Sequence, residues 1–133
     1  MASALRQVTI HIDTSFLVHA LTGRFVGLDS LEEAVKRGDI LRVSTPVVFE
    51  WLRGPRTDQE LRLQERFTPA AEAVPFGVEE ARAAAKVYRA LTRARGRDVD
   101  IAIAACAIEH EAALWTLNPQ DFKDIPGLRL YRA

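Results

Sequence analysis

The strongest constraint on the fold is a repeated order, in which short runs of branched apolar residues alternate with stretches of helical periodicity. In the first run, Val8, Ile10 and Ile12 alternate with polar residues and lead to Asp13, which predicts a β-strand. The segment SFLVHALTG that follows predicts a short helix closed by Gly23. Such alternation favours a parallel sheet with helices on both faces. The expected fold class is therefore α/β, a three-layer α/β/α sandwich with a mainly parallel central sheet.

The rest of the chain continues this order. Further helices are predicted over residues 28–38, 45–54, 57–67, 78–95 and 98–110, with Thr45 as the N-cap of the second of these and Pro46 at its first position. Strands are predicted for ILRVS (40–44), AVPF (73–76), ALWTL (113–117) and LRLY (128–131), and a turn for NPQDF (118–122). The 133 residues contain no repeat or linker, so one domain over residues 1–133 is expected.

Composition restricts the setting of this domain. The chain is 48% hydrophobic and 27% charged, which is typical of a folded protein. It has no run of roughly 20 apolar residues that could span a membrane, and its start lacks the apolar core of a secretory signal. The single cysteine, Cys106, cannot form an intramolecular disulfide and lies among alanines, which predicts a buried thiol in a reducing compartment. The expected location is cytoplasmic, with no membrane partner.

The first candidate site residue is Asp13. Ligands of open parallel sheets bind beyond the carboxyl ends of the strands, and Asp13 follows the first predicted strand directly. The alternative is that Asp13 caps the next helix, because Asp is a preferred N-cap residue.

The second candidate is Glu50, whose neighbours in the segment TPVVFEWLRG are nearly all apolar. A carboxylate withdrawn from water without a partner is costly, so Glu50 requires a cation or a hydrogen-bond donor. The alternative is a salt bridge to Arg53, three residues further along the helix.

Two more carboxylates, Asp98 and Asp100, begin the apolar segment DIAIAACAI. Acids in the first turn of a helix interact favourably with the helix dipole, which explains one of them. We assign capping to Asp98 and a chemical role to Asp100, because Asp100 is followed directly by the apolar run. Asp98 remains an outer ligand candidate.

Three carboxylates placed in this way favour a hard divalent cation. Mg²⁺ and Mn²⁺ take oxygen ligands, whereas zinc prefers His or Cys. The histidines His11, His19 and His110 form no zinc motif. A metal ion on a phosphodiester can polarise it and supply hydroxide from a bound water, so no His, Ser or Cys nucleophile is required.

Four segments of the chain resemble the PIN domain, and particularly the VapC-type toxin ribonucleases: IDTSFL, VVFEWLRG, GRDVDIAIAACAI and EHEAALWTLNPQDFKDIPGL. The resemblance covers nearly the whole chain in the family's order. It places the family's three acids on Asp13, Glu50 and Asp100. It implies a ribonuclease dependent on Mg²⁺ or Mn²⁺, RNA as substrate, products with 5′-phosphate and 3′-hydroxyl ends, a homodimer, and a cognate antitoxin that blocks the site.

The fourth polar position of the family falls on Asn118, a neutral oxygen donor, with Asp121 as a nearby alternative. Ser15 and Thr116 are expected as polar neighbours of the site. For both, the alternative is ordinary hydrogen bonding at the ends of strands.

Basic residues recur along the long helix predicted over residues 78–95. Spacings of four, three and four place them on one face, which could follow a phosphate backbone. The alternative is a solvated face paired with Glu79 and Glu80, and the formal net charge of zero gives RNA binding no support. The residues of this basic stripe are Arg82, Lys86, Arg89 and Arg93.

Other functions fit the sequence less well. A dehalogenase-like phosphatase needs a second Asp where Ser15 stands, and a phosphoryl receiver needs an acid pair before its first helix and a late lysine. A PIN-like module that only binds, without cleaving, is disfavoured by the presence of all three acids. A housekeeping RNA-processing nuclease remains the main alternative, and the short chain favours the toxin.

Overall fold

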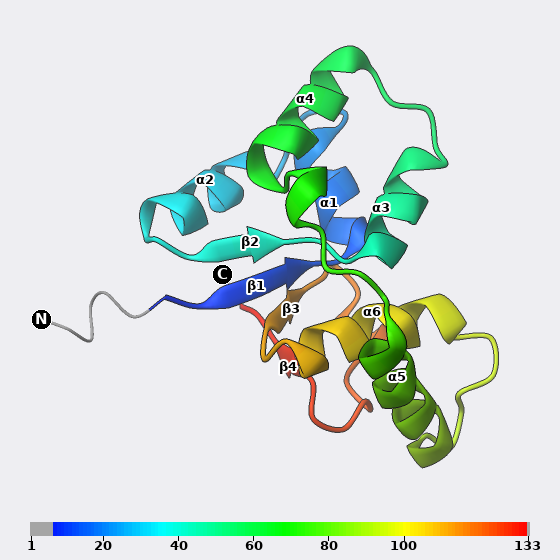
Figure 1. The fold of residues 1–133 in the computed structure, drawn as a ribbon. Coiled ribbons are helices and arrows are strands. Elements are labelled where there is room, and N and C mark those ends of the chain that lie inside the picture. The colour runs from blue at the N-terminus through cyan, green and yellow to red at the C-terminus, as the bar shows by residue number, and fades with distance from the viewer. Residues whose placement is uncertain (1–6, 133) are drawn as a thin grey trace, which may run out of the picture.

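The computed structural model describes residues 7–132, and a four-stranded sheet lies at its centre (Figure 1). The strands are β1 (Thr9–Ile12), β2 (Ile40–Arg42), β3 (Ala113–Trp115) and β4 (Arg129–Leu130). They lie in the order β2–β1–β3–β4, and every neighbouring pair is parallel. The predicted α/β fold with a parallel sheet is confirmed.

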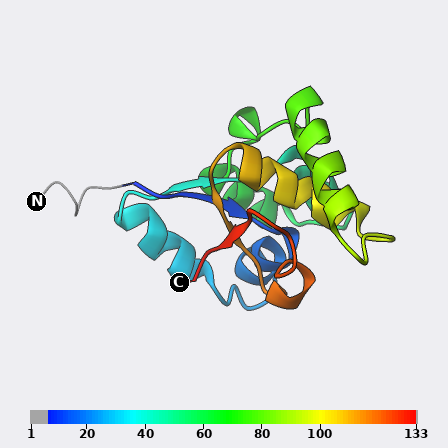
Figure 2. The ribbon, with the colours of Figure 1, turned by 90° about the horizontal axis from the view of Figure 1, so that it is seen from below.

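Helices cover both faces of the sheet, as Figure 2 shows when the molecule is viewed from below. One face carries α1 (Thr14–Leu21) and α2 (Leu28–Lys36), and the other carries α5 (Val78–Ala90) and α6 (Asp98–Glu109). The helix α3 (Thr45–Leu52) packs against α1 and α6, and α4 (Asp58–Phe67) packs against α1. Two short 3-10 turns complete the chain, η2 (Ala70–Glu72) and η3 (Pro119–Asp121).

The core lies between the central strands and the helices. Ile10, Ile12 and Leu114 are fully buried, as is most of α6 between Ile103 and Ala107. Apolar residues on every side of a helix are typical of a helix enclosed by protein. The α6 helix therefore forms a rigid support for the carboxylates in its first turn.

The ends of β1 and β3 meet at one edge of the sheet. Ile12 pairs with Trp115, and the backbone N–H of Asp13 donates to the Trp115 carbonyl at 2.9 Å. Because parallel strands run in the same direction, their carboxyl ends lie at the same edge of the sheet. Asp13 and Thr116 therefore lie side by side although 103 residues separate them.

The start of α3 differs by one residue from the prediction. Ser44 is the N-cap, and Thr45 is already the first helical residue. The Thr45 hydroxyl instead accepts a hydrogen bond from the backbone N–H of Phe76 at 3.0 Å. The Thr45 side chain thus joins α3 to the segment that leads into α5.

Two predicted elements are wrong in extent or type. The long helix ends at Ala90 and not at residue 95, because Leu91 takes an extended conformation with its side chain half-buried. The AVPF segment forms no strand, but only a single parallel bridge between Ser44 and Val74. Pro75, which has no N–H to donate, follows this bridge directly.

Within residues 7–132, no helix is long and apolar enough to cross a membrane. The N-terminal segment, for which the sequence predicts no secretory signal, lies largely outside the described residues.

Candidate metal centre

Asp13 is buried at the carboxyl end of β1, with 5% of its surface exposed. It precedes α1, but its side chain makes no capping hydrogen bond to that helix. One carboxylate oxygen, Oδ2, instead accepts hydrogen bonds from the hydroxyls of Thr116 at 2.7 Å and Ser15 at 2.9 Å. Two hydroxyls from opposite ends of the chain therefore orient this carboxylate.

The surroundings of Asp13 affect its charge in opposite directions. Burial raises the pKa of this carboxyl, while the hydrogen bonds from Thr116 and Ser15 lower it. The negative charge of Glu50 adds to the increase in pKa. The net shift is upward and is caused mainly by burial, so the charged form of Asp13 is incompletely compensated by its own donors.

Glu50 lies on α3 with 19% of its side chain exposed, and both of its oxygens have partners. The Thr14 hydroxyl donates to Oε1 at 2.6 Å, and a guanidinium nitrogen of Arg53 lies 3.6 Å from Oε2. The Arg53 side chain is 61% exposed, so this ion pair is weak and easily exchanged. Thr14 thus links Glu50 to the residue next to Asp13.

Asp100 lies in the first turn of α6 and faces other acids. Burial, the largest cause, and the charges of Asp13, Asp121 and Glu50 together raise the pKa of Asp100 to about 6, against a lowering effect of Arg97. Because like charges interact in this way only at short range, the three candidate acids share one electrostatic environment. They come from three elements that are far apart in the sequence.

A cavity of about 320 Å³ opens between α3 and the start of α6. Glu50, Asp98 and Asp100 line it, together with Arg97. Asp98 is the first residue of α6 and not its N-cap, which is Arg97. The capping role predicted for Asp98 is therefore wrong, and its exposed carboxylate belongs to the cavity wall.

The fourth predicted position lies beside β3. Asn118 is exposed and precedes η3, and its backbone N–H donates to the Thr116 hydroxyl at 3.0 Å. Asp121, at the end of η3, is also exposed and raises the pKa of Asp100 by its charge. Thr116 therefore connects Asn118 to Asp13, and Asp121 connects electrostatically to Asp100.

The donor set fits a hard cation that keeps part of its water shell. Between residues 7 and 132, no three His, Cys, Asp or Glu side chains are grouped closely enough to hold a metal ion as they stand. The available donors are nevertheless carboxylate oxygens in mutual repulsion, lining a cavity. Mg²⁺ is commonly held by one or two carboxylates and several waters, so it does not require three carboxylates in direct contact.

Histidine and cysteine residues meet elsewhere, at the opposite end of α6. The ring centroids of His11 and His110 are 6.2 Å apart, and the His110 imidazole lies 2.7 Å from Glu80. Cys106 is fully buried, as expected, and burial raises its pKa to about 12. Glu80, expected on a solvated face, is 8% exposed and also accepts from the backbone of Gly77.

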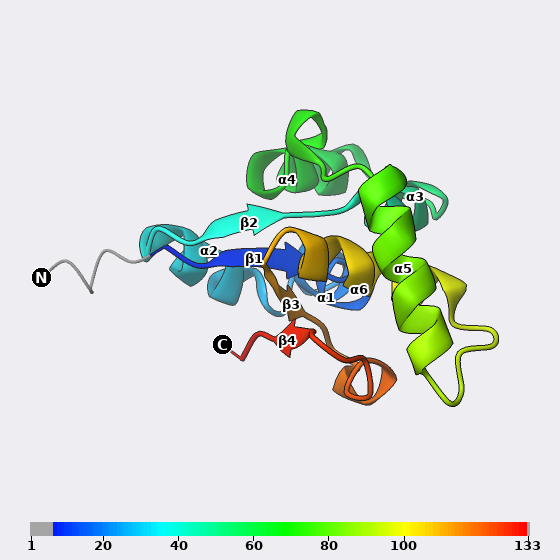
Figure 3. The same cartoon turned by 60° about the horizontal axis from the view of Figure 1, so that its bottom comes forward.

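Three of the four residues of the basic stripe, Arg82, Lys86 and Arg89, lie on α5 as the sequence predicts. Arg82 and Lys86 line a groove with Ile108, whereas Arg89 lines a different cavity beside Asp98. Arg93 lies beyond the end of α5, in the connection that Figure 3 shows leading from α5 to α6. The prediction that Arg93 lies on the same helix face as the other three basic residues is therefore wrong.

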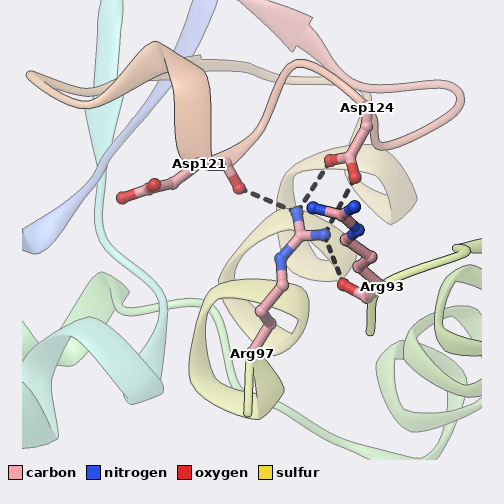
Figure 4. A network of polar contacts seen from close by, with 4 residues as sticks. All are labelled: Arg93, Arg97, Asp121 and Asp124. Atoms are coloured by element: carbon pink, nitrogen blue, oxygen red, sulfur yellow. Dashed lines mark hydrogen bonds and ion pairs between the residues drawn. The ribbon is translucent and has the colours of Figure 1, made fainter. Parts of the chain in front are cut away.

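Sequence reasoning missed a network centred on Arg97 (Figure 4). Its guanidinium donates to both carboxylate oxygens of Asp124, at 2.7 and 2.9 Å. It also donates to the backbone carbonyls of Asp121 at 2.9 Å and Arg93 at 2.8 Å. The available signal was an arginine just before the acids of α6, but its partners lie 24 and 27 residues away.

Two comparisons place these features in context. The family model of the PIN domain matches residues 10–128. The chain is 32% identical over 113 residues to a Ribonuclease VapC of Rickettsia bellii, covering 83% of this chain and 69% of that protein. It is 34% identical over 120 residues to Ribonuclease VapC19 of Mycobacterium tuberculosis, covering 89% and 95%.

Solved structures share the same arrangement of elements. VapBC2 of Rickettsia felis, bound to a DNA fragment from its promoter, matches 93% of this chain and 98% of its own, with a TM-score of 0.73 and 20% identity. DNA-bound VapBC of Salmonella typhimurium matches 93% and 97%, with a TM-score of 0.75 and 18% identity. At these identities the likeness concerns the fold.

Proposed function

The chain belongs to the PIN domain family and to its VapC ribonucleases, and on that premise we propose that it is a metal-dependent endoribonuclease that hydrolyses RNA phosphodiester bonds. The observation that supports the proposal is that Glu50 and Asp100 line one cavity, and that Asp13 acts on Asp100 through its charge. These carboxylates come from separate elements, and the charges of Asp13 and Glu50 help to raise the pKa of Asp100. Neighbouring carboxylates with too few protein cations beside them favour the binding of a positive ligand.

We propose Mg²⁺ or Mn²⁺ as that ligand, held by Asp13, Glu50 and Asp100 in part through water, with Asn118 or Asp121 completing the polar wall. When bound, such an ion polarises the scissile phosphate and lowers the pKa of a coordinated water. The oxygen-only donor set favours these ions over zinc.

The other residues of the site keep its carboxylates oriented. Thr116 and Ser15 donate to one oxygen of Asp13, which leaves the second oxygen for a ligand. Thr14 holds one oxygen of Glu50, and the exposed Arg53 shields the other until a stronger partner replaces it. Hydroxyl donors suit this role because they stabilise a carboxylate without adding a competing positive charge.

We further propose that the protein is the toxin of a type II toxin–antitoxin pair, cytoplasmic and active as a homodimer. The VapBC names of the structural neighbours support an antitoxin partner. The exposed apolar side chains of Phe49 and Leu52 on α3 and Val78 on α5, which are 60%, 55% and 67% exposed, support burial of this face in an assembly.

Contact with RNA is proposed for the basic residues of α5 and the following connection. Arg89 is the best placed, because the cavity it lines also includes Asp98 of the metal centre. Arg82 and Lys86 face a separate groove and would extend the surface, and Arg93 would act from the connection. Charge reversal at Arg89 should reduce the slope of log K against log salt by about 0.7; an unchanged slope would leave only a solvated face.

Cleavage of a structured RNA by the purified protein tests the proposed function. Cleavage should require Mg²⁺ or Mn²⁺, stop with EDTA, and leave 5′-phosphate ends. The Asp13→Asn variant should bind RNA but not cleave it. Cleavage that persists in EDTA, or in Asp13→Asn, would refute the assignment.

A growth assay separates the toxin from a housekeeping RNA-processing nuclease. Expression of the active protein should arrest growth, and coexpression of the product of a neighbouring small gene should restore it. Cleavage of RNA in vitro without any growth arrest would favour the housekeeping nuclease. Binding of RNA without cleavage would favour a module that only binds.

A further inference from the structure

Arg97 joins three separate segments beside the metal centre. Its backbone begins α6, since its carbonyl accepts the first helical hydrogen bond from Ile101 at 2.9 Å. Its guanidinium contacts the connection before α6 through the Arg93 carbonyl. It also contacts residues 118–125, the η3 segment, through Asp121 and Asp124 (Figure 4). With 21% of its side chain exposed, Arg97 is largely enclosed by these partners.

The η3 segment needs such an attachment on its acidic side. Phe122 and Ile125 anchor it to the core, with 2% and 4% exposed. Asp121 and Asp124 are exposed, and Arg97 binds the carboxylate of Asp124 but only the backbone carbonyl of Asp121. The apolar anchors fix the depth of the segment, while hydrogen bonds from Arg97 determine its position along the start of α6.

Charge gives Arg97 a second reason to occupy this place. The hydrogen bonds that Arg97 donates to Asp124 are the largest cause of its raised pKa, and the charges of Asp124, Asp100 and Asp121 add to the increase. The planar guanidinium offers donors in a fixed fork, so it can hold a carboxylate and two carbonyls at once, which a lysine cannot do. A positive group here allows the acids of α6 and η3 to approach each other before any cation binds.

We propose that Arg97 is a positioning residue that holds the η3 segment, with Asn118 and Asp121, against the first turn of α6, with Asp100. This inference rests on the proposed function, because it assigns Arg97 the task of presetting the distance between the third and fourth polar groups of the metal centre. The donors of the Arg97 guanidinium are engaged by Asp124 and by the carbonyls of Asp121 and Arg93, so Arg97 acts through these groups.

Substitution of Arg97 tests the proposal by metal binding, measured apart from cleavage. Arg97→Gln removes the charge and the fork, and Arg97→Lys keeps the charge but not the fork. Mn²⁺ titration by calorimetry should show binding weakened about tenfold in Arg97→Gln, the effect typical for residues behind metal ligands. Arg97→Lys should be weakened almost as much, because geometry and not charge alone is required.

Hydrogen exchange tests the same proposal without metal. Amides of residues 120–125 should exchange faster in both Arg97 variants, and in Asp124→Asn to a smaller degree. Arg37→Lys provides the matched control, because Arg37 pairs with Asp39 at 3.3 Å on an exposed surface outside the network. This control should retain wild-type metal binding, exchange and cleavage.

The outcomes separate this proposal from the proposed function. Wild-type protein that binds no Mn²⁺ would defeat the metal-dependent function itself. Wild-type protein that binds Mn²⁺, with Arg97→Gln binding it equally well, would overturn the role of Arg97 alone. A purely structural role would lower the melting temperature and kcat while leaving the half-saturating metal concentration unchanged, and that result also overturns the proposal.

Discussion

The two ends of α6 place carboxylates in opposite surroundings. Beyond its C-terminal end, Glu80 is buried but paired with His110 at 2.7 Å, and the hydrogen bond from His110 lowers the pKa of Glu80. At its N-terminal end, burial and neighbouring acids raise the pKa of Asp100 to about 6. At the C-terminal end of the helix the carboxylate has a histidine partner, whereas at the N-terminal end the carboxylate has other acids as neighbours.

This difference distinguishes structural charge from charge kept for chemistry. A carboxylate that the protein neutralises contributes to folding and needs nothing from outside. Carboxylates that repel one another cost stability, so their retention indicates a ligand that relieves the repulsion. The comparison assigns Glu80 to the first class and Asp100 to the second.

The largest expected effect is on cleavage. Asp100→Asn removes a charge from the metal centre and should reduce RNA cleavage at least about 100-fold, more than the loss of a supporting residue would. Glu80→Gln, at the other end of the helix, should stay within about threefold of wild type, because it touches no part of the centre. Equal losses in the two variants, measured by single-turnover cleavage, would abolish the distinction.

Metal should stabilise only one end of the helix. Mg²⁺ at 100 times its dissociation constant should stabilise the wild type by about 2.7 kcal/mol against unfolding. Glu80→Gln should gain the same amount, whereas Asp100→Asn should gain little. Thermal unfolding with and without Mg²⁺ measures this, with Ca²⁺-free buffer as reference; equal gains in all three proteins would place the ion elsewhere.

Without metal, the two variants should differ in the opposite sense. Glu80→Gln weakens a charge-assisted hydrogen bond to a half-exposed imidazole and should cost about 1 kcal/mol of unfolding free energy. Asp100→Asn relieves repulsion and should leave stability unchanged or increased at neutral pH. Urea unfolding at pH 7 in EDTA decides this, and a less stable Asp100→Asn would show that the acids are structural.

The smallest expected effect is a pair of opposite pH dependences. The pKa of Asp100 is raised from 3.8 to about 6, so its contribution to stability is full below pH 3.8 and is lost as pH rises through 6. The pKa of Glu80 is lowered, so its contribution is present above pH 4.5 and is lost as pH falls through the lowered value. Relative to wild type, Asp100→Asn should therefore become more stable as pH rises from 3.8 to 6, whereas Glu80→Gln should become less stable as pH rises to 4.5. Both variants should converge with wild type at lower pH, as urea unfolding across this range would measure.

Much of the fold was predictable because its signals are local. Alternating apolar residues predicted β1, and the charged helical pattern from residue 57 predicted α4, which begins with a capping box of Thr57 and Glu60. The end of α5 was not predictable in this way, because the segment beyond Ala90 is rich in helix-forming residues. Burial of Ala94 and the bond from Arg97 to the Arg93 carbonyl stabilise a non-helical path there. The Arg97 guanidinium is in turn held by Asp124, 27 residues away, which the local pattern does not reveal.

The same division applies to the candidate site. The acids could be proposed from the sequence because a carboxylate beside an apolar run is unusual wherever it occurs. The bond from Thr14 to Glu50 and the network around Arg97 could not, because residues tens of positions apart make them. The pairing of Glu80 with His110 was hidden for the same reason, and Glu80 looked like one more solvated acid of a charged helix.

The central position of β1 determines when the molecule can first become active during its synthesis. The Asp13 carboxylate is oriented by Thr116, and β1 pairs with β3, which the ribosome delivers about a hundred residues later. In a nascent chain, the edge of β1 that pairs with β3 therefore stays unpaired until nearly all of the protein has emerged. On the proposed function, RNA cleavage begins only after β3 has paired with β1. The nascent chain therefore does not cleave the mRNA that encodes it.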